Sequence, residues 1–246
     1  MSDLAVRFKA VEDDCKDALA TLDNVLKHVA AANPAAELRV IILNNVIVAL
    51  ISTTEESLRE LFHEYLTVLE ENFEDHKMLS LDLRKANLDC GIQQLKNATR
   101  DSDFRRAAAI AGDLSKCLKN EQGYRLFKKE LTYNEGNFRS RQLTTTAKRV
   151  GIEELWPRIS DSAEVKEYTD EPVRDTRTNK LIADWNAVFD ERDRIVHKIS
   201  EAKASGWSED KIRGAMRLSL LIVCRVCTCL IEELERLIGR NDRSSS

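Results

Sequence analysis

The chain has 246 residues, 43% of them hydrophobic, and is therefore long enough to bury a sizeable core of its own. Its 38 basic and 42 acidic residues give a formal net charge of -4, which excludes strong nonspecific attraction of the whole chain to nucleic acid. Only 8 Gly and 3 Pro interrupt a composition rich in helix formers, so the sequence predicts an all-α fold.

The first part of the sequence predicts two long helices. Ser2 and Asp3 offer N-caps for a helix to about Ala31, along which apolar residues recur at intervals of three and four. A second helix is expected from Ala35 to about Asn72, and its first half is apolar almost all round. That first half is expected at the centre of a helical bundle.

The middle of the chain carries a weaker pattern. Between residues 77 and 170 the periodicity predicts shorter helices, among them 104–118 and a helix that starts near Ser140 and ends at Gly151. After the turn residues at 169–172, a longer helix is expected from Thr178 to about Ile199.

The C-terminal part predicts one more helix, capped by Ser208, running to about Leu237 and ending at Gly239. We find no repeat and no linker. The simplest division is a helical extension at residues 1–33 that packs on the core, a helical domain at 35–240 and a disordered tail at 241–246.

The cysteines and the apolar runs indicate a cytoplasmic protein. Six cysteines lie in helical, apolar surroundings, which favours reduced thiols. Cys224, Cys227 and Cys229 stand mid-helix and are expected as buried thiols, not as a metal site. The apolar runs at 40–51 and 218–231 are shorter than the roughly 20 residues of a membrane span, and no signal peptide is evident.

The segment Arg192-Asp193-Arg194-Ile195-Val196-His197 is the strongest functional signal. On a helix, Arg192 shares one face with five apolar residues, namely Leu181, Trp185, Val188, Ile195 and Ile199. A guanidinium on an apolar face needs a partner or a purpose, so a structural ion pair and a functional site explain it about equally well. His197 lies about 140° around the helix from Arg192, so the two side chains do not share one narrow stripe. The end of the helix or a facing copy from a second subunit would help to bring them to one cleft.

This pattern resembles the signature of the HEPN superfamily. In that signature an Arg is followed by a polar residue, three further residues and a His, all on one helix, and a second apolar helix comes next. Residues 45–66 are similar to the long opening helix of its RiboL-PSP-type branch, and residues 137–140 and 149–152 resemble it as well. The likeness spans about residues 40–237. It implies a helical bundle whose C-terminal helix pair carries the R-x-x-x-x-H motif.

The resemblance also implies an activity, because many members of that superfamily are endoribonucleases that act as toxins or in defence against phage. Metal-independent cleavage can use the 2′-hydroxyl of RNA as nucleophile, and no cofactor or metal is expected. His197 would act as general base or acid, Arg192 would stabilise the charge on the phosphate, and Asp193 would orient them or contact substrate. Arg194 and Lys198 would bind the RNA backbone, although both could equally be solvated surface residues.

The motif of one chain supplies a single His, so a homodimer that pairs two copies of the motif is expected, as the resemblance also implies. The expected partners are RNA, a second copy of the chain, and an antitoxin or a defence-system protein. No association with a membrane is expected. The alternative is a non-catalytic module that recognises a nucleotide, RNA or protein, which the acidic isoelectric point of about 5.7 favours. The acidic stretch around His63 and His76 lacks zinc-site spacing and predicts a solvated face.

Overall fold

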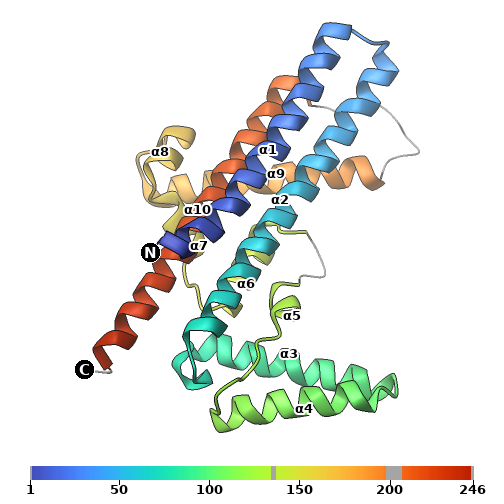
Figure 1. Cartoon of the computed structure of the whole chain (residues 1–246). Helices are drawn as coiled ribbons and strands as arrows, with labels where there is room; N and C mark the ends of the chain where they lie inside the picture. The colour runs from blue at the N-terminus through green and yellow to red at the C-terminus, as the bar shows by residue number, and fades with distance from the viewer. Residues whose placement is uncertain (1, 134–136, 198–206, 245–246) are drawn as a thin grey trace.

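The computed structural model describes residues 2–133, 137–197 and 207–244, and throughout these ranges the regular secondary structure is helical (Figure 1). The all-α prediction is confirmed.

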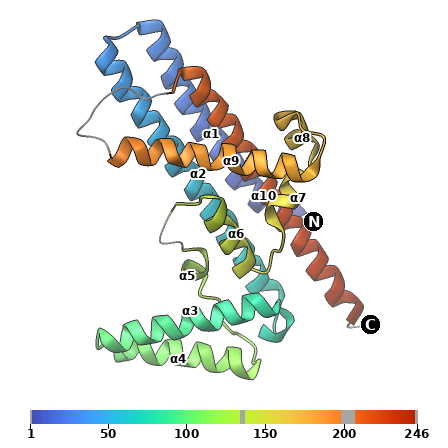
Figure 2. The same ribbon diagram turned by 180° about the vertical axis from the view of Figure 1, so that it is seen from behind.

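Three long helices form the centre of the molecule. They are α1 (Ser2–Ala32), α2 (Ala36–Asn72) and α10 (Glu209–Ser244), and each packs along the other two (Figures 1 and 2). Side chains from all three belong to one hydrophobic cluster, in which Phe8 and Leu58 are fully buried. The second helix does lie at the centre, but the prediction that its first half is the central part is wrong, because Leu38 and Ile41 there are exposed whereas Leu58, Leu61 and Leu66 of its second half are fully buried.

The helix that carries the motif, α9 (Arg174–His197), crosses this trio and packs on α2. Two short helices, α7 (Leu155–Ser160) and α8 (Ala163–Thr169), pack against α9, and Figure 2 shows them near its first residues. Three aromatic rings join α7 to α9, since Trp185 contacts both Trp156 and Phe189 at centroid distances of 6.4 and 5.1 Å.

A helical hairpin extends from the other end of α2. It consists of α3 (Leu81–Arg100) and α4 (Phe104–Lys119), which bury a small apolar cluster of their own made of Ala98, Ala107, Ile110 and Leu114. The 3-10 turn η1 (His76–Met78) leads into the hairpin. The short helices α5 (Lys128–Thr132) and α6 (Ser140–Arg149) then lead the chain back toward α9 (Figure 2).

Two helix ends differ from the sequence-based prediction. The last helix was expected to end at Gly239 before a disordered tail at 241–246, whereas α10 continues to Ser244; Gly239 lacks the positive φ of a helix-ending glycine. The helix expected from Thr178 begins at Arg174. The guanidinium of buried Arg177 donates to the carbonyl oxygens of Ser160, Glu171 and Pro172, which holds that first turn in place.

By length and composition alone, α2 and α10 could cross a membrane, with 18-residue windows of mean hydropathy 1.6 and 1.8. Within the fold, 28% and 56% of these two windows are buried. Such helices also occur in the cores of soluble proteins, so the cytoplasmic location stays a prediction. The six cysteines are free, and burial raises the pKa of both Cys90 and Cys224 to about 11.

Candidate functional site

The face of α9 that was predicted to be apolar is buried over most of its length. Leu181, Trp185 and Val188 are all buried, whereas the side chain of Arg192 keeps 28% of its accessible surface. The expectation that Arg192 lies among apolar side chains is therefore wrong in part, because this end of α9 projects beyond α2 and has fewer neighbours there (Figure 1). Ile199 lies outside the described residues.

Arg192 is anchored through one nitrogen. Its Nη1 donates to Oδ1 of Asp193 at 2.9 Å and to Oδ1 of Asn137 at 3.3 Å. Within the described ranges, the Nε and Nη2 groups of Arg192 donate no hydrogen bond. One edge of the guanidinium is therefore fixed, and the other edge keeps the donors that would bind an oxyanion bidentately.

Asp193 is the centre of this polar cluster. Its Oδ1 also accepts from Nδ2 of Asn137 at 3.1 Å, and its Oδ2 accepts from Nη2 of Arg139 at 2.8 Å. Burial alone would raise the pKa of Asp193, but the hydrogen bonds from Arg139 and Arg192 lower it overall. A carboxylate with these partners stays charged and orients Arg192, so of the two predicted roles the geometry favours the orienting one.

The segment before α6 is held on both α2 and α9 by its backbone. The N–H of Phe138 donates to the carboxylate of Glu55 at 2.9 Å, and the carbonyl of Phe138 accepts from the Trp185 indole at 2.8 Å. Asn186 accepts from the N–H of Ser140 at 3.0 Å. Phe138 is fully buried between these partners, so the backbone on both sides of it is held in place. This positions the side chains of Asn137 and Arg139 beside Arg192 and Asp193.

The remaining motif residues lie in the last turns of α9. Arg194 donates to both carboxylate oxygens of Glu191, at 2.9 and 2.6 Å, so its guanidinium is largely used within the helix. Because Glu191 is buried, its ion pair with Arg194 is a structural contact that the sequence did not predict, and the RNA contact of Arg194 stays a prediction. His197 is exposed, and in the described part of the chain no hydrogen bond or ion pair engages its imidazole. The predicted RNA-binding residue Lys198 lies outside the described residues.

Two residues of this cluster, Asn137 and Arg139, were not predicted from the sequence as part of the site. They were noted only within the stretch 137–140 that resembles a HEPN pattern. A signal was available on α9, where Asn186, Asp190 and Asp193 form a polar stripe at i, i+4 and i+7 beside the apolar face. All three contact residues 137–140, and Arg139 donates to Asp190 at 2.5 Å.

Two hollows of the surface lie away from this cluster. One of about 460 Å³ opens between α2, α4 and α5, and a second of about 1100 Å³ opens between α3, α5 and α6. Neither is lined by a residue of α9. In the described ranges, no cluster of three or more His, Cys, Asp or Glu side chains is placed to hold a metal ion.

No family model, curated protein or solved structure matches the chain. The likeness to the HEPN superfamily therefore stays a prediction from sequence pattern.

Proposed function

We propose that the protein is a metal-independent endoribonuclease, with Arg192 and His197 at the end of α9 as its reactive groups. One observation carries the proposal. The guanidinium of Arg192 is fixed by Asn137 and Asp193 through Nη1 alone, so its free Nε and Nη2 edge is oriented in advance at a partly exposed position. A preorganised donor pair is what a developing phosphorane charge needs.

The charges around Arg192 cancel, so a ligand would be bound here by hydrogen bonds and not by a net positive charge. Arg192 and Arg139 balance Asp190 and Asp193, so the cluster has no excess positive charge. Binding of a phosphate here would depend on the geometry of the guanidinium, for which lysine is no substitute. The proposed reaction is attack of a 2′-hydroxyl on the adjacent phosphate, which yields a 2′,3′-cyclic phosphate and a free 5′-hydroxyl end.

The proposal includes a second copy of the chain. His197 follows Arg192 by five positions, which places the two residues about 7.5 Å apart along the axis of α9 and about 140° apart around it. One helix therefore does not bring both groups to one phosphate. A two-fold arrangement of two α9 ends would place the His of each copy near the Arg of the other and supply both an acid and a base.

The alternative proposal is a non-catalytic binding module, and a specific observation favours it. Arg192 and Asp193 both tie α9 to the segment before α6, as a purely structural ion pair would. In that case substitution of Arg192 would change stability without changing any reaction.

The test is RNA cleavage by the purified chain in EDTA, compared among wild type, Arg192→Lys and His197→Ala. We expect products that end in 2′,3′-cyclic phosphate, and a loss of about 10²- to 10⁴-fold for His197→Ala, as for removal of a general acid or base. Arg192→Lys keeps the positive charge but loses the two parallel N–H donors of the guanidinium, so we expect a comparable loss of cleavage rate.

Matched controls are His28→Ala and Arg105→Ala, which change an exposed histidine and an exposed arginine on α1 and α4. Circular dichroism of each variant separates loss of fold from loss of activity. Cleavage that survives equally in all four variants would come from a contaminant and refute the proposal. Folded wild type that leaves every tested RNA intact would favour the binding module.

A further inference from the structure

The two hollows on the α3 to α6 side adjoin one another. Both are lined by Gln94, Arg106, Lys129 and Glu130, so together they form one continuous depression, which we call the trough. Its larger part, about 1100 Å³, exceeds the roughly 300–1,000 Å³ of a usual small-molecule pocket. The trough is therefore large enough for a segment of an extended polymer.

The larger part of the trough is rich in cations from separate helices. Lys85, Arg106, Lys129, Lys148 and Arg149 line it, against the carboxylates of Asp82, Asp89 and Glu130. These eight side chains carry a net charge of +2, whereas the formal net charge of the whole chain is -4. A local concave surface thus has the opposite sign to the molecule as a whole.

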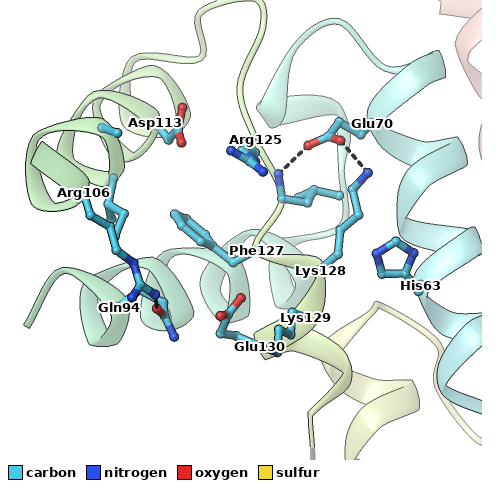
Figure 3. Close-up of a pocket in the computed structure, with 13 residues that line it drawn as sticks. His63, Glu70, Gln94, Arg106, Asp113, Arg125, Phe127, Lys128, Lys129 and Glu130 are labelled. Carbon is cyan, nitrogen blue, oxygen red and sulfur yellow. Dashed lines mark hydrogen bonds and ion pairs between the residues drawn. The ribbon is translucent and has the colours of Figure 1, made fainter. Parts of the chain in front are cut away.

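Three of these cations are free to bind. In the described part of the chain, no carboxylate lies within 4.0 Å of the ammonium group of Lys85, Lys129 or Lys148, which come from α3, α5 and α6. Lys128, in the smaller hollow, shows the contrast. Figure 3 shows its ammonium directed at Glu70, at 2.6 Å, so Lys128 is already neutralised.

An exposed aromatic ring accompanies the free lysines. Tyr133 lines the same part of the trough and is 57% exposed, and its carbonyl accepts a hydrogen bond from Arg149 at 3.2 Å. Flat rings beside a row of cations are typical of proteins that bind single-stranded nucleic acid, because bases stack on the ring while cations follow the phosphates.

The helix α6 connects the trough with the site on α9. Its first residue, Ser140, contacts Asn186 of α9, whereas Thr144 and Lys148, four and eight residues later on the same side of the helix, face the trough. At 1.5 Å per residue, Lys148 lies about 12 Å along α6 from Ser140. A few nucleotides of extended strand would cover that distance.

We infer that the trough binds the backbone of single-stranded RNA and leads it along α6 toward Arg192. The direction of the strand rests on the proposed function, whereas binding in the trough does not require catalysis. The bases stack on Tyr133, and Lys85, Lys129 and Lys148 bind successive phosphates.

The test is the affinity of the full chain for a labelled RNA of roughly 10 nucleotides that carries 2′-O-methyl groups, measured by fluorescence anisotropy at several salt concentrations. The methyl groups block 2′-hydroxyl attack, so binding is measured without cleavage. For the triple variant Lys85→Gln, Lys129→Gln, Lys148→Gln, we expect affinity to fall about 10-fold or more. The slope of log K against log salt should fall by about 2, since each contact contributes about 0.7 for single strands.

The matched control is Lys96→Gln, Lys119→Gln, Lys166→Gln, which removes the same charge from exposed lysines outside the trough. Tyr133→Ala should weaken binding about 10-fold with an unchanged salt slope, and Tyr133→Phe should restore it. If the control triple weakens binding as much as the trough triple, or wild type does not bind, the inference is overturned. If binding follows the expected pattern while unmodified RNA is never cleaved, the trough stands and the nuclease proposal falls.

Discussion

At the scale of single residues, the buried imidazole of His76 links stability to pH. Its ring is 1% exposed and packs edge-on against Tyr124 at a centroid distance of 5.2 Å, and its Nε2 lies 3.4 Å from the amide nitrogen of Asn87. Burial lowers the pKa of His76, and the nearby charge of Arg84 lowers it further. The folded protein therefore keeps this histidine neutral at a pH where the unfolded chain binds a proton.

A group whose folded pKa is lowered in this way contributes stability that is complete above its unfolded pKa of about 6.5 and is lost as the pH falls. We expect the free energy of unfolding to decrease from about pH 7.5 to about pH 5.5. Urea denaturation at these two pH values measures the free energy of unfolding. His76→Phe, which retains a buried ring without a titrating group, should show a smaller decrease than wild type. An equal decrease in both proteins would mean that other groups cause the pH dependence.

His76 also shows what the sequence alone could not reveal at this scale. The acidic residues beside it predicted a solvated face, and this prediction is wrong for His76, although His63 is exposed. Periodicity identifies a face only within a helix, and His76 follows the end of α2, in the short turn η1. Asp193, one partner of Arg192, was predicted, but its other partner, Asn137, was not, because Asn137 comes before α6 begins and lies 55 residues away in the sequence.

At the scale of elements, Gly91 allows α3, α4 and α5 to meet. A β-carbon added at this position would lie 2.6 Å from Leu114 Cδ2 and 2.8 Å from Phe127 Cζ. We expect Gly91→Ala to destabilise the protein by about 1–3 kcal/mol through overpacking, although alanine gains up to about 1 kcal/mol in helix propensity. Thermal unfolding measures the difference.

The matched control for this substitution is Gly112→Ala in α4, where an added β-carbon meets no atom within 4 Å. Only the propensity gain applies there, so we expect this variant to be more stable than wild type by up to about 1 kcal/mol. If Gly91→Ala and Gly112→Ala changed the stability in the same direction, the lack of space around Gly91 would not explain the effect of Gly91→Ala.

Helix positions were predictable from the sequence because caps and apolar spacing are local properties. Ser208 accepts a hydrogen bond from the N–H of Lys211, as its predicted role as a cap requires, and Asp103 does the same for Arg106 at the start of α4. The trough was not predictable. Lys85, Lys129 and Lys148 have no common spacing, and only the return of the chain through α5 and α6 brings them to one surface.

At the scale of the whole molecule, α1 takes part in the central core. From the sequence, residues 1–33 were expected as a helical extension packed on the core of the domain at 35–240, because the HEPN likeness begins near residue 40. In the structure, α1 contributes five buried side chains to the core, which are Phe8, Cys15, Leu19, Leu26 and Val29. Contacts with both α2 and α10 explain why a helix outside the family pattern is so thoroughly buried.

The magnitude of this burial predicts the effect of removing α1. Each large apolar side chain contributes about 1.5–3 kcal/mol when buried, so α1 supplies on the order of 10 kcal/mol, comparable to the whole stability of an average domain. We expect a chain that starts at Ala35 to lose cooperative thermal unfolding and to aggregate through the uncovered faces of α2 and α10. Phe8→Ala in the full chain should cost about 3–5 kcal/mol, whereas Val6→Ala, which is 62% exposed, should be nearly neutral. A monomeric truncated chain that unfolds cooperatively near the wild-type temperature would show that α1 is an addition to an independent domain.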